Sequence, residues 1–223
     1  MDVAVGWCTE FEPKRKVRSL LYASRPPALF LYHFGRLIGG AGRAILDEDL
    51  GLRGLSVEAS DALRASNIAY LSSHGRMDAS CCYQFRLRCG EWSPANTGLG
   101  GASVLVLDTC NVTTRQVKAH ESAWVSRGRA TPAIVLGFVG AATDGYEESM
   151  RGRAFVEHLW AGETFVQSWF NAIQDTQGLR RRDQGVAIGF GPTCSEASAV
   201  LDTATLTSVP APTVADFCAW RTQ

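Results

Sequence analysis

The sequence predicts an α/β domain in three layers, with a mostly parallel β-sheet covered by helices on both faces. Several short segments are continuously apolar, as parallel strands buried on both faces are. These segments alternate along the chain with segments of helical periodicity, which favours parallel strands joined by helical crossovers. The 223 residues contain no Pro/Gly/Ser-rich linker and no long charge block, so we assign residues 1–223 to a single domain.

In the first third of the chain, apolar runs and helix-breaking residues mark the elements. The valine-rich run 2–8 predicts the first strand. A helix is expected over 28–37, because two prolines precede this segment and two glycines follow it. Residues 56–65 predict a short amphipathic helix that begins with a serine able to cap it. The apolar run 68–74 then predicts a buried strand.

The middle of the chain predicts two further central strands and a ribbon. Residues 81–92 alternate irregularly between apolar and polar, which indicates an antiparallel ribbon or a flap beside the predicted site. The apolar run 103–110 predicts the next strand, and 117–127 a helix. A proline then opens another strong strand, 133–139.

The last third predicts a broken helix and one more strand. Residues 151–175 are expected to be helical with a break at Gly162. The apolar side chains at i, i+4 spacing around this break are expected to face the core: Phe155, Leu159, Phe165, Trp169 and Ile173. Residues 185–190 predict the last central strand, and the tail from Ser208 is expected to be extended along the surface. The run 180–183, three arginines and an aspartate, is expected to be a solvated loop, or a self-processing site if the protein prefers arginine.

Charge and composition argue against several classes of partner. Lys and Arg number 22, as do Asp and Glu, so nothing global favours nucleic acid or an anionic membrane as a partner. No window holds the roughly 20 apolar residues of a membrane span. The N-terminus lacks the features of a signal peptide, and the seven cysteines are expected to be free thiols. We therefore expect a cytoplasmic protein.

Two of the predicted strands end on residues that can act as a base or a nucleophile. The run 68–74 ends on His74 and the run 103–110 ends on Cys110. Parallel neighbouring strands bring their carboxyl ends to one edge of a sheet, where open α/β sheets carry function. A cysteine acts as a nucleophile through its thiolate, and imidazole is the usual base that generates it. The two residues therefore predict a catalytic pair.

The residue after the histidine predicts an oxyanion hole. Gly75 has no Cβ, so a substrate carbonyl can approach its backbone N–H closely. That N–H, together with the N–H of Cys110, is expected to hold the oxyanion. The predicted reaction is acyl transfer through a thioester, with water as the default acceptor.

The sequences Tyr70-Leu71-Ser72-Ser73-His74-Gly75 and Leu107-Asp108-Thr109-Cys110 resemble the caspase-like cysteine peptidases, which include metacaspases, gingipains, separases and legumains. That group shows one apolar block ending in His-Gly and a second ending in the catalytic cysteine. The resemblance covers residues 66–175, together with the first strand expected at 2–8, and is closest in pattern to metacaspases and gingipain-like bacterial proteins. It implies a caspase-like three-layer sandwich and an endopeptidase. The His-Ser-Gly that often follows a metacaspase cysteine is replaced here by residues 111–113, Asn-Val-Thr.

The resemblance also implies a recognition pocket beside the cysteine. Asp108 and Asp144 lie near predicted strand ends and are the acidic candidates to line it, which would favour arginine or lysine in the substrate. Asp108 has the alternative of bonding backbone groups. Asp144 has the alternative of an ordinary turn, because Thr143 and Gly145 flank it.

No cofactor or metal is expected. Cys81, Cys82 and Cys89 do not have the spacing of paired zinc ligands. The glycine-rich segment 98–101 precedes a strand instead of joining a strand to a helix, so it is no phosphate loop.

Two alternatives to an endopeptidase remain open at this point. The same pair of residues suits a small-molecule acyl-transfer or cyclising enzyme of a bacterial biosynthetic pathway, for which a closed apolar cavity would be the sign. A non-catalytic caspase-like binding protein would use the same sheet edge without an activated thiol. An edge-to-edge homodimer is compatible with any of the three.

Overall fold

The structure is a computed structural model of the whole chain. It describes residues 1–7, 18–39, 41–45, 65–72, 75–77, 83–87, 90–92, 102–110, 112, 130–143, 145–178, 183–214 and 217–223. The predicted helices 56–65 and 117–127 lie almost wholly or wholly outside these residues, and so does the glycine-rich segment 98–101.

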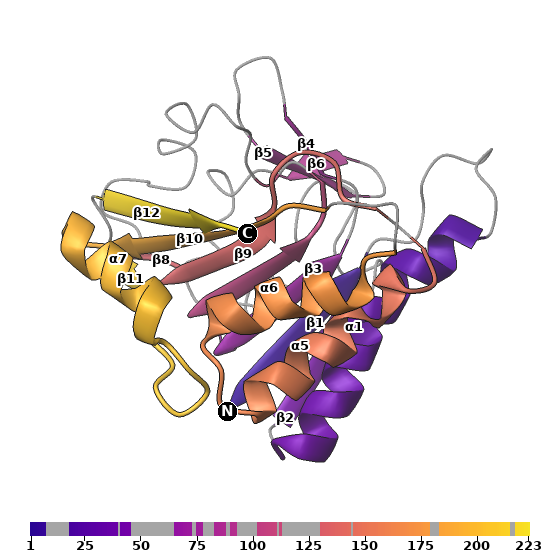
Figure 1. Cartoon of the computed structure of the whole chain (residues 1–223), viewed down its shortest axis with the longest axis horizontal. Coiled ribbons are helices and arrows are strands. Elements are labelled where there is room, and N and C mark those ends of the chain that lie inside the picture. Colours follow the sequence, from indigo (N-terminus) through magenta and orange to yellow (C-terminus); the bar gives the residue numbers. More distant parts are fainter. Residues whose placement is uncertain are drawn as a thin grey trace.

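The main sheet has seven strands in the order β12-β10-β9-β7-β3-β1-β2 (Figure 1). The strands are β1 (Asp2–Trp7), β2 (Ala41–Ile45), β3 (Ile68–Ser72), β7 (Val104–Asp108), β9 (Ile134–Phe138), β10 (Gly185–Gly191) and β12 (Phe217–Thr222). The five strands from β2 to β9 are parallel, and β10 is antiparallel to both of its neighbours. The predicted α/β class with a mostly parallel sheet is confirmed. The strands β3, β7, β9 and β10 are fully buried, as continuous apolar runs require.

Two small sheets accompany the main one. β4 (Gly75–Met77), β5 (Tyr83–Leu87) and β6 (Gly90–Trp92) form an antiparallel sheet of three strands. The antiparallel character predicted for 81–92 is confirmed, and the sheet also takes in the residues that follow His74. β8 (Ala130–Thr131) pairs with β11 (Thr213–Val214).

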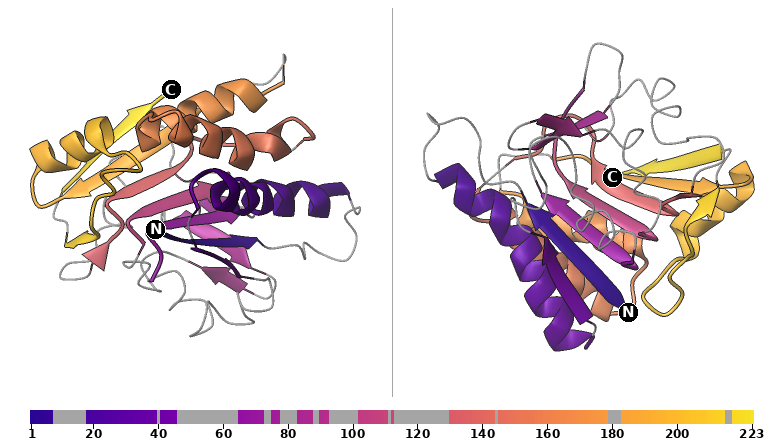
Figure 2. Two further views of the ribbon diagram at one scale, coloured as in Figure 1. Left: turned by 90° about the horizontal axis from the view of Figure 1, so that it is seen from below. Right: turned by 180° about the vertical axis from the view of Figure 1, so that it is seen from behind.

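Three helices lie together on one side of the main sheet (Figures 1 and 2). They are α1 (Arg18–Leu37), α5 (Arg151–Trp160) and α6 (Phe165–Thr176), with a short 3₁₀ turn, η2 (Glu148–Met150), before α5. α5 packs between α1 and α6, and α7 (Cys194–Thr203) packs on β10 and β12. The predicted break at Gly162 is confirmed, because this glycine adopts a φ of 88° between α5 and α6.

Aromatic side chains fill the space between these helices and the sheet. Trp169 of α6 lies 5.3 Å from the Phe138 ring of β9 and 5.8 Å from the Phe155 ring of α5. Its indole N–H donates to the carbonyl of Gly137 at 2.9 Å, so its buried polar atom is satisfied. Phe30 of α1 completes the cluster. All five side chains predicted to face the core around Gly162 are buried: Phe155, Leu159, Phe165, Trp169 and Ile173.

One sequence prediction about the ends of elements is wrong, and another is incomplete. α1 begins ten residues earlier than expected and runs through Pro26 and Pro27. Both prolines are buried, so their packing offsets the hydrogen bonds that they remove from the helix. The C-terminal tail from Ser208 is half-buried or exposed over 208–214, as expected, but residues 217–222 also form a strand that pairs with 186–191 of β10.

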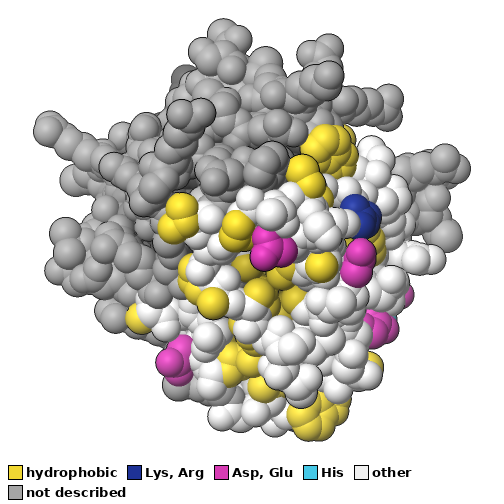
Figure 3. Space-filling model, turned by 90° about the vertical axis from the view of Figure 1, so that its left-hand side faces the viewer, with side chains coloured by type: hydrophobic (Ala, Val, Ile, Leu, Met, Phe, Trp, Pro, Cys, Tyr) yellow, Lys and Arg dark blue, Asp and Glu magenta, His cyan; other side chains and the backbone are white. Residues whose placement is uncertain are grey.

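The side of the molecule that carries α7 shows hydrophobic side chains scattered among polar ones (Figure 3). Val214 of β11 and Trp220 of β12 are the large exposed hydrophobic residues of these two strands. None of the described helices combines the length and apolar character that crossing a bilayer requires.

A glycine permits the close contact between α1 and α5. A Cβ at Gly152 would lie only 1.9 Å from the carbonyl oxygen of Pro26. Gly152→Ala is therefore expected to lower the free energy of unfolding by about 1–3 kcal/mol, because the helices must separate. Gly35 is the matched control: it lies in α1 with nothing within 4 Å of its Cβ position. Gly35→Ala is expected to stabilise by about 0.5–1 kcal/mol. Urea unfolding measures both, and equal stabilisation by the two variants would contradict the packing.

Candidate active site

The two strands that the sequence predicts to carry the catalytic pair are neighbours in the sheet. β3 and β7 are parallel, and Ser72, the last residue of β3, is paired with Asp108, the last residue of β7. The predicted adjacency of these strands is therefore confirmed. Cys110 follows Asp108 by two positions, and His74 follows Ser72 by two positions in the sequence. His74 lies outside the described residues, so the place of its imidazole stays a prediction.

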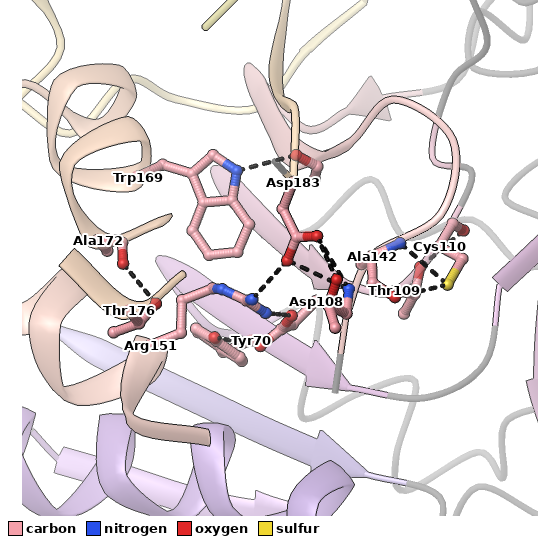
Figure 4. Close-up of polar contacts among 12 residues, drawn as sticks. Tyr70, Asp108, Thr109, Cys110, Ala142, Arg151, Trp169, Ala172, Thr176 and Asp183 are labelled. Atoms are coloured by element: carbon pink, nitrogen blue, oxygen red, sulfur yellow. Dashed lines mark hydrogen bonds and ion pairs between the residues drawn. The ribbon is translucent and has the colours of Figure 1, made fainter. Parts of the chain in front are cut away.

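The sulfur of Cys110 contacts the backbone of Ala142, which lies in the loop after β9 (Figure 4). The backbone N–H of Ala142 donates to Sγ at 3.3 Å, and the carbonyl oxygen of Ala142 lies 3.6 Å from Sγ. The carbonyl accepts from a thiol, whereas the N–H stabilises a thiolate. Cys110 is half-buried. Ala142 was not among the predicted residues, because a backbone contact leaves no side-chain signal in the sequence.

A buried ion-pair cluster lies next to this sulfur (Figure 4). Arg151, the first residue of α5, donates from Nη1 to Oδ1 of Asp108 at 2.5 Å and from Nη2 to Oδ2 of Asp183 at 3.1 Å. The hydroxyl of Tyr70 donates to the other oxygen of Asp108 at 2.8 Å. Arg151 is 1% exposed, Asp108 8% and Asp183 7%. We call these four residues the clamp.

The surroundings of the clamp keep its two donors, Arg151 and Tyr70, protonated. Burial alone would lower the pKa of Arg151, but the carboxylates of Asp108 and Asp183 outweigh it and raise that pKa. Burial raises the pKa of Tyr70 well above its ordinary value, and the nearby charge of Asp108 raises it further. Tyr70 therefore stays a neutral hydroxyl that donates, and Arg151 stays charged. The guanidinium also lies over the Phe138 ring, 4.7 Å from its centroid.

Asp108 is engaged inside the protein. The sequence predicts it as a substrate-binding residue, but both of its oxygens accept bonds from clamp residues. A substrate cation would have to displace Arg151 to reach it. We therefore assign to Asp108 the role of holding Arg151 in place. Asp144 lies outside the described residues.

The oxyanion-hole residues stay a prediction. Gly75 begins β4 and is paired with Phe85 of β5, and Cys110 lies two residues after the end of β7. Cys81, Cys82 and Cys89 lie outside the described residues. In the part of the chain that the structure describes, no group of three or more His, Cys, Asp or Glu residues is arranged to hold a metal ion.

Sequence reasoning assigned no site role to three of the clamp residues, Tyr70, Arg151 and Asp183. Asp183 belongs to the run 180–183 predicted to be a solvated loop, and for this residue the prediction is wrong. For Arg151 the sequence predicts only the start of a helical segment. Its partners lie 43 and 32 residues away in the sequence, so no local spacing connects them. The one available signal was a single arginine beginning an otherwise apolar helix face.

A second titratable cluster lies away from the clamp. Nδ1 of His158 is 3.0 Å from Glu163 and Nε2 is 2.8 Å from Asp175. Burial lowers the pKa of His158, but the hydrogen bonds and charges of these two carboxylates outweigh it, so the pKa is raised.

This cluster predicts a pH dependence of stability. The pKa of His158 is higher in the folded state than in the unfolded state. Protonated His158 therefore adds its full contribution to the free energy of unfolding below about pH 6.5, and this contribution is lost as the pH rises through the folded pKa. We expect a loss of at most about 1 kcal/mol, since the pair with Asp175 is largely solvated. Urea unfolding at about pH 5.5 and 8.5 should show this loss in the wild type and a smaller one in His158→Gln. An equal pH dependence in both would contradict the assignment.

No protein-family model matches the sequence, and a search of curated proteins finds no match.

Proposed function

We propose that the protein is a cysteine-dependent acyl hydrolase with a caspase-like three-layer fold, most simply an endopeptidase. Cys110 is the nucleophile and His74 the base. The observation that carries the proposal is the register of β3 and β7: Ser72 pairs with Asp108, so both candidate residues stand two positions beyond the same rung of the sheet.

The geometry of neighbouring strands allows the His74 imidazole to reach the Cys110 sulfur. Neighbouring strands lie about 4.8 Å apart, and two residues of extended chain span at most about 7 Å. An imidazole two residues beyond Ser72 is thereby within reach of a sulfur two residues beyond Asp108. The resemblance of residues 66–175 to caspase-like peptidases supports the same assignment, as does a mostly parallel sheet with helices packed on it.

The reaction follows from these two groups. His74 takes the proton of the Cys110 thiol, and the thiolate attacks the acyl carbon of the substrate. The tetrahedral intermediate collapses to a thioester, and the leaving amine takes the proton from His74. Water, deprotonated by His74, then attacks the thioester, and the acid leaves with Cys110 regenerated. The N–H groups of Gly75 and Cys110 hold the oxyanion in both halves.

A peptide-library cleavage assay read by mass spectrometry tests the proposal. We expect cleavage by the wild type that is blocked by prior alkylation of Cys110. The library must be unbiased at the residue before the cut, because Asp108 is occupied by Arg151 and gives no reason to favour basic residues. Absence of cleavage, with Cys110 nevertheless alkylated much faster than Cys194, would overturn the peptidase and favour a small-molecule acyl substrate. If no peptide is cleaved and Cys110 is alkylated no faster than Cys194, a binding protein is favoured.

A further inference from the structure

We propose that Thr143 is a positioning residue, which holds the backbone N–H of Ala142 against the Cys110 sulfur through Asp183 of the clamp. This inference rests on the proposed role of Cys110 as nucleophile. It assigns to the clamp a part in setting the reactivity of the thiol, beyond its part in stability.

Thr143 is bound to Asp183 by three hydrogen bonds. Its backbone N–H donates to both carboxylate oxygens at 3.1 Å, and its hydroxyl donates to Oδ1 at 2.7 Å. Thr143 directly follows Ala142, whose N–H meets the sulfur at 3.3 Å. The position of that N–H is therefore fixed from the next residue along the chain.

The clamp also holds the other side of the contact. Asp108 lies two residues before Cys110 and accepts from the same guanidinium that binds Asp183. Arg151 thus ties the segment that carries the sulfur to the segment that carries its N–H donor. Since Arg151 is 1% exposed and packed over Phe138, the link has little freedom to move.

This arrangement matters when the thiol loses its proton. The contact between the sulfur and the carbonyl of Ala142 then loses its hydrogen, while the N–H of Ala142 continues to donate to Sγ. The clamp contains two carboxyl groups for one guanidinium, so it does not itself attract a thiolate. A fixed N–H donor offsets this unfavourable surrounding, and it does so only while Thr143 keeps the loop in place.

Thr143→Val and Thr143→Ser separate the positioning role from packing. Valine keeps the shape and removes the hydroxyl, whereas serine keeps the hydroxyl. The readout is the rate at which iodoacetamide alkylates Cys110 between about pH 5 and 9, followed by peptide mapping. Cys194, exposed at the start of α7, is the reference within the same molecule.

We expect Thr143→Val to slow alkylation of Cys110 about 3- to 10-fold at neutral pH and to move its pH profile upward, while Cys194 is unchanged. Thr143→Ser should stay within about twofold of the wild type. A valine variant with the wild-type profile would overturn the inference, as would equal losses in both variants. If Thr143→Val does not fold, Thr143→Ala serves as the variant without a hydroxyl.

The two proposals fail in different ways. If the valine and serine variants differ as expected but no acyl substrate is hydrolysed, the positioning role stands and the proposed function fails. If substrates are hydrolysed but the alkylation profiles coincide, the hydrolase stands and the positioning role fails.

Discussion

Replacing Cys110 with alanine is expected to lower kcat/KM for acyl hydrolysis by about 10⁴-fold or more, because the variant has no atom to form the thioester. The fold is expected to persist, since the side chain is half-buried and its removal leaves both ion pairs of Arg151 in place. The measurement is hydrolysis of a peptide selected from the library, together with thermal unfolding of the variant.

Cys194→Ala is the matched control for this experiment. Cys194 is a second cysteine, exposed at the first turn of α7, which packs on β10 and β12. Full activity is expected from it. Comparable residual activity in the Cys110→Ala and Cys194→Ala proteins would show that the hydrolysis does not use Cys110.

Arg151→Met is expected to lower the free energy of unfolding by about 3–5 kcal/mol, the largest change in stability predicted for this chain. Methionine fills most of the space but leaves Asp108 and Asp183 buried without their cation. Urea unfolding measures the loss. Adding Asp108→Asn and Asp183→Asn to the same chain is expected to recover part of it, because the buried charges are then removed.

Arg153 supplies the control on the same helix. Its side chain is 46% exposed and pairs with Glu157 at 2.8 Å, four residues further along α5. Arg153→Met is expected to cost at most about 0.5 kcal/mol, because an exposed pair is solvated and screened. A similar loss from Arg151→Met and Arg153→Met would show that burial of the clamp does not make it costly to break.

The central strands could be predicted from the sequence, because burial on both faces demands unbroken apolar runs. The predicted runs 68–74, 103–110 and 133–139 each contain the strand observed there. Edge elements carry weaker signals. β2 and β12 pair on one side only within the described sheet, and neither was predicted as a strand. α7 was also missed, although Thr193 caps it: its hydroxyl oxygen accepts a hydrogen bond from the Glu196 N–H at 3.2 Å.

In the candidate site, too, residues with a local sequence signal could be predicted, and residues that meet only through tertiary packing could not. The cysteine and the histidine could be proposed from the sequence because each is the last residue of a predicted strand segment. The clamp could not, because Arg151 and Asp183 meet only when α5 and the segment before β10 pack against the end of β7. Ala142 contributes backbone alone, and any residue type offers an N–H at that place.

The central claim is that Cys110 and His74 act as a pair, and the pH profile of Cys110 alkylation tests it most directly. It should be measured in the wild type, in His74→Gln and in His33→Gln, whose histidine lies on α1 beside Tyr32. We expect the wild type and His33→Gln to react fast at neutral pH, and His74→Gln to react only as the pH rises toward about 8.5, like an ordinary thiol. Coincident profiles for the wild type and His74→Gln would contradict the pair.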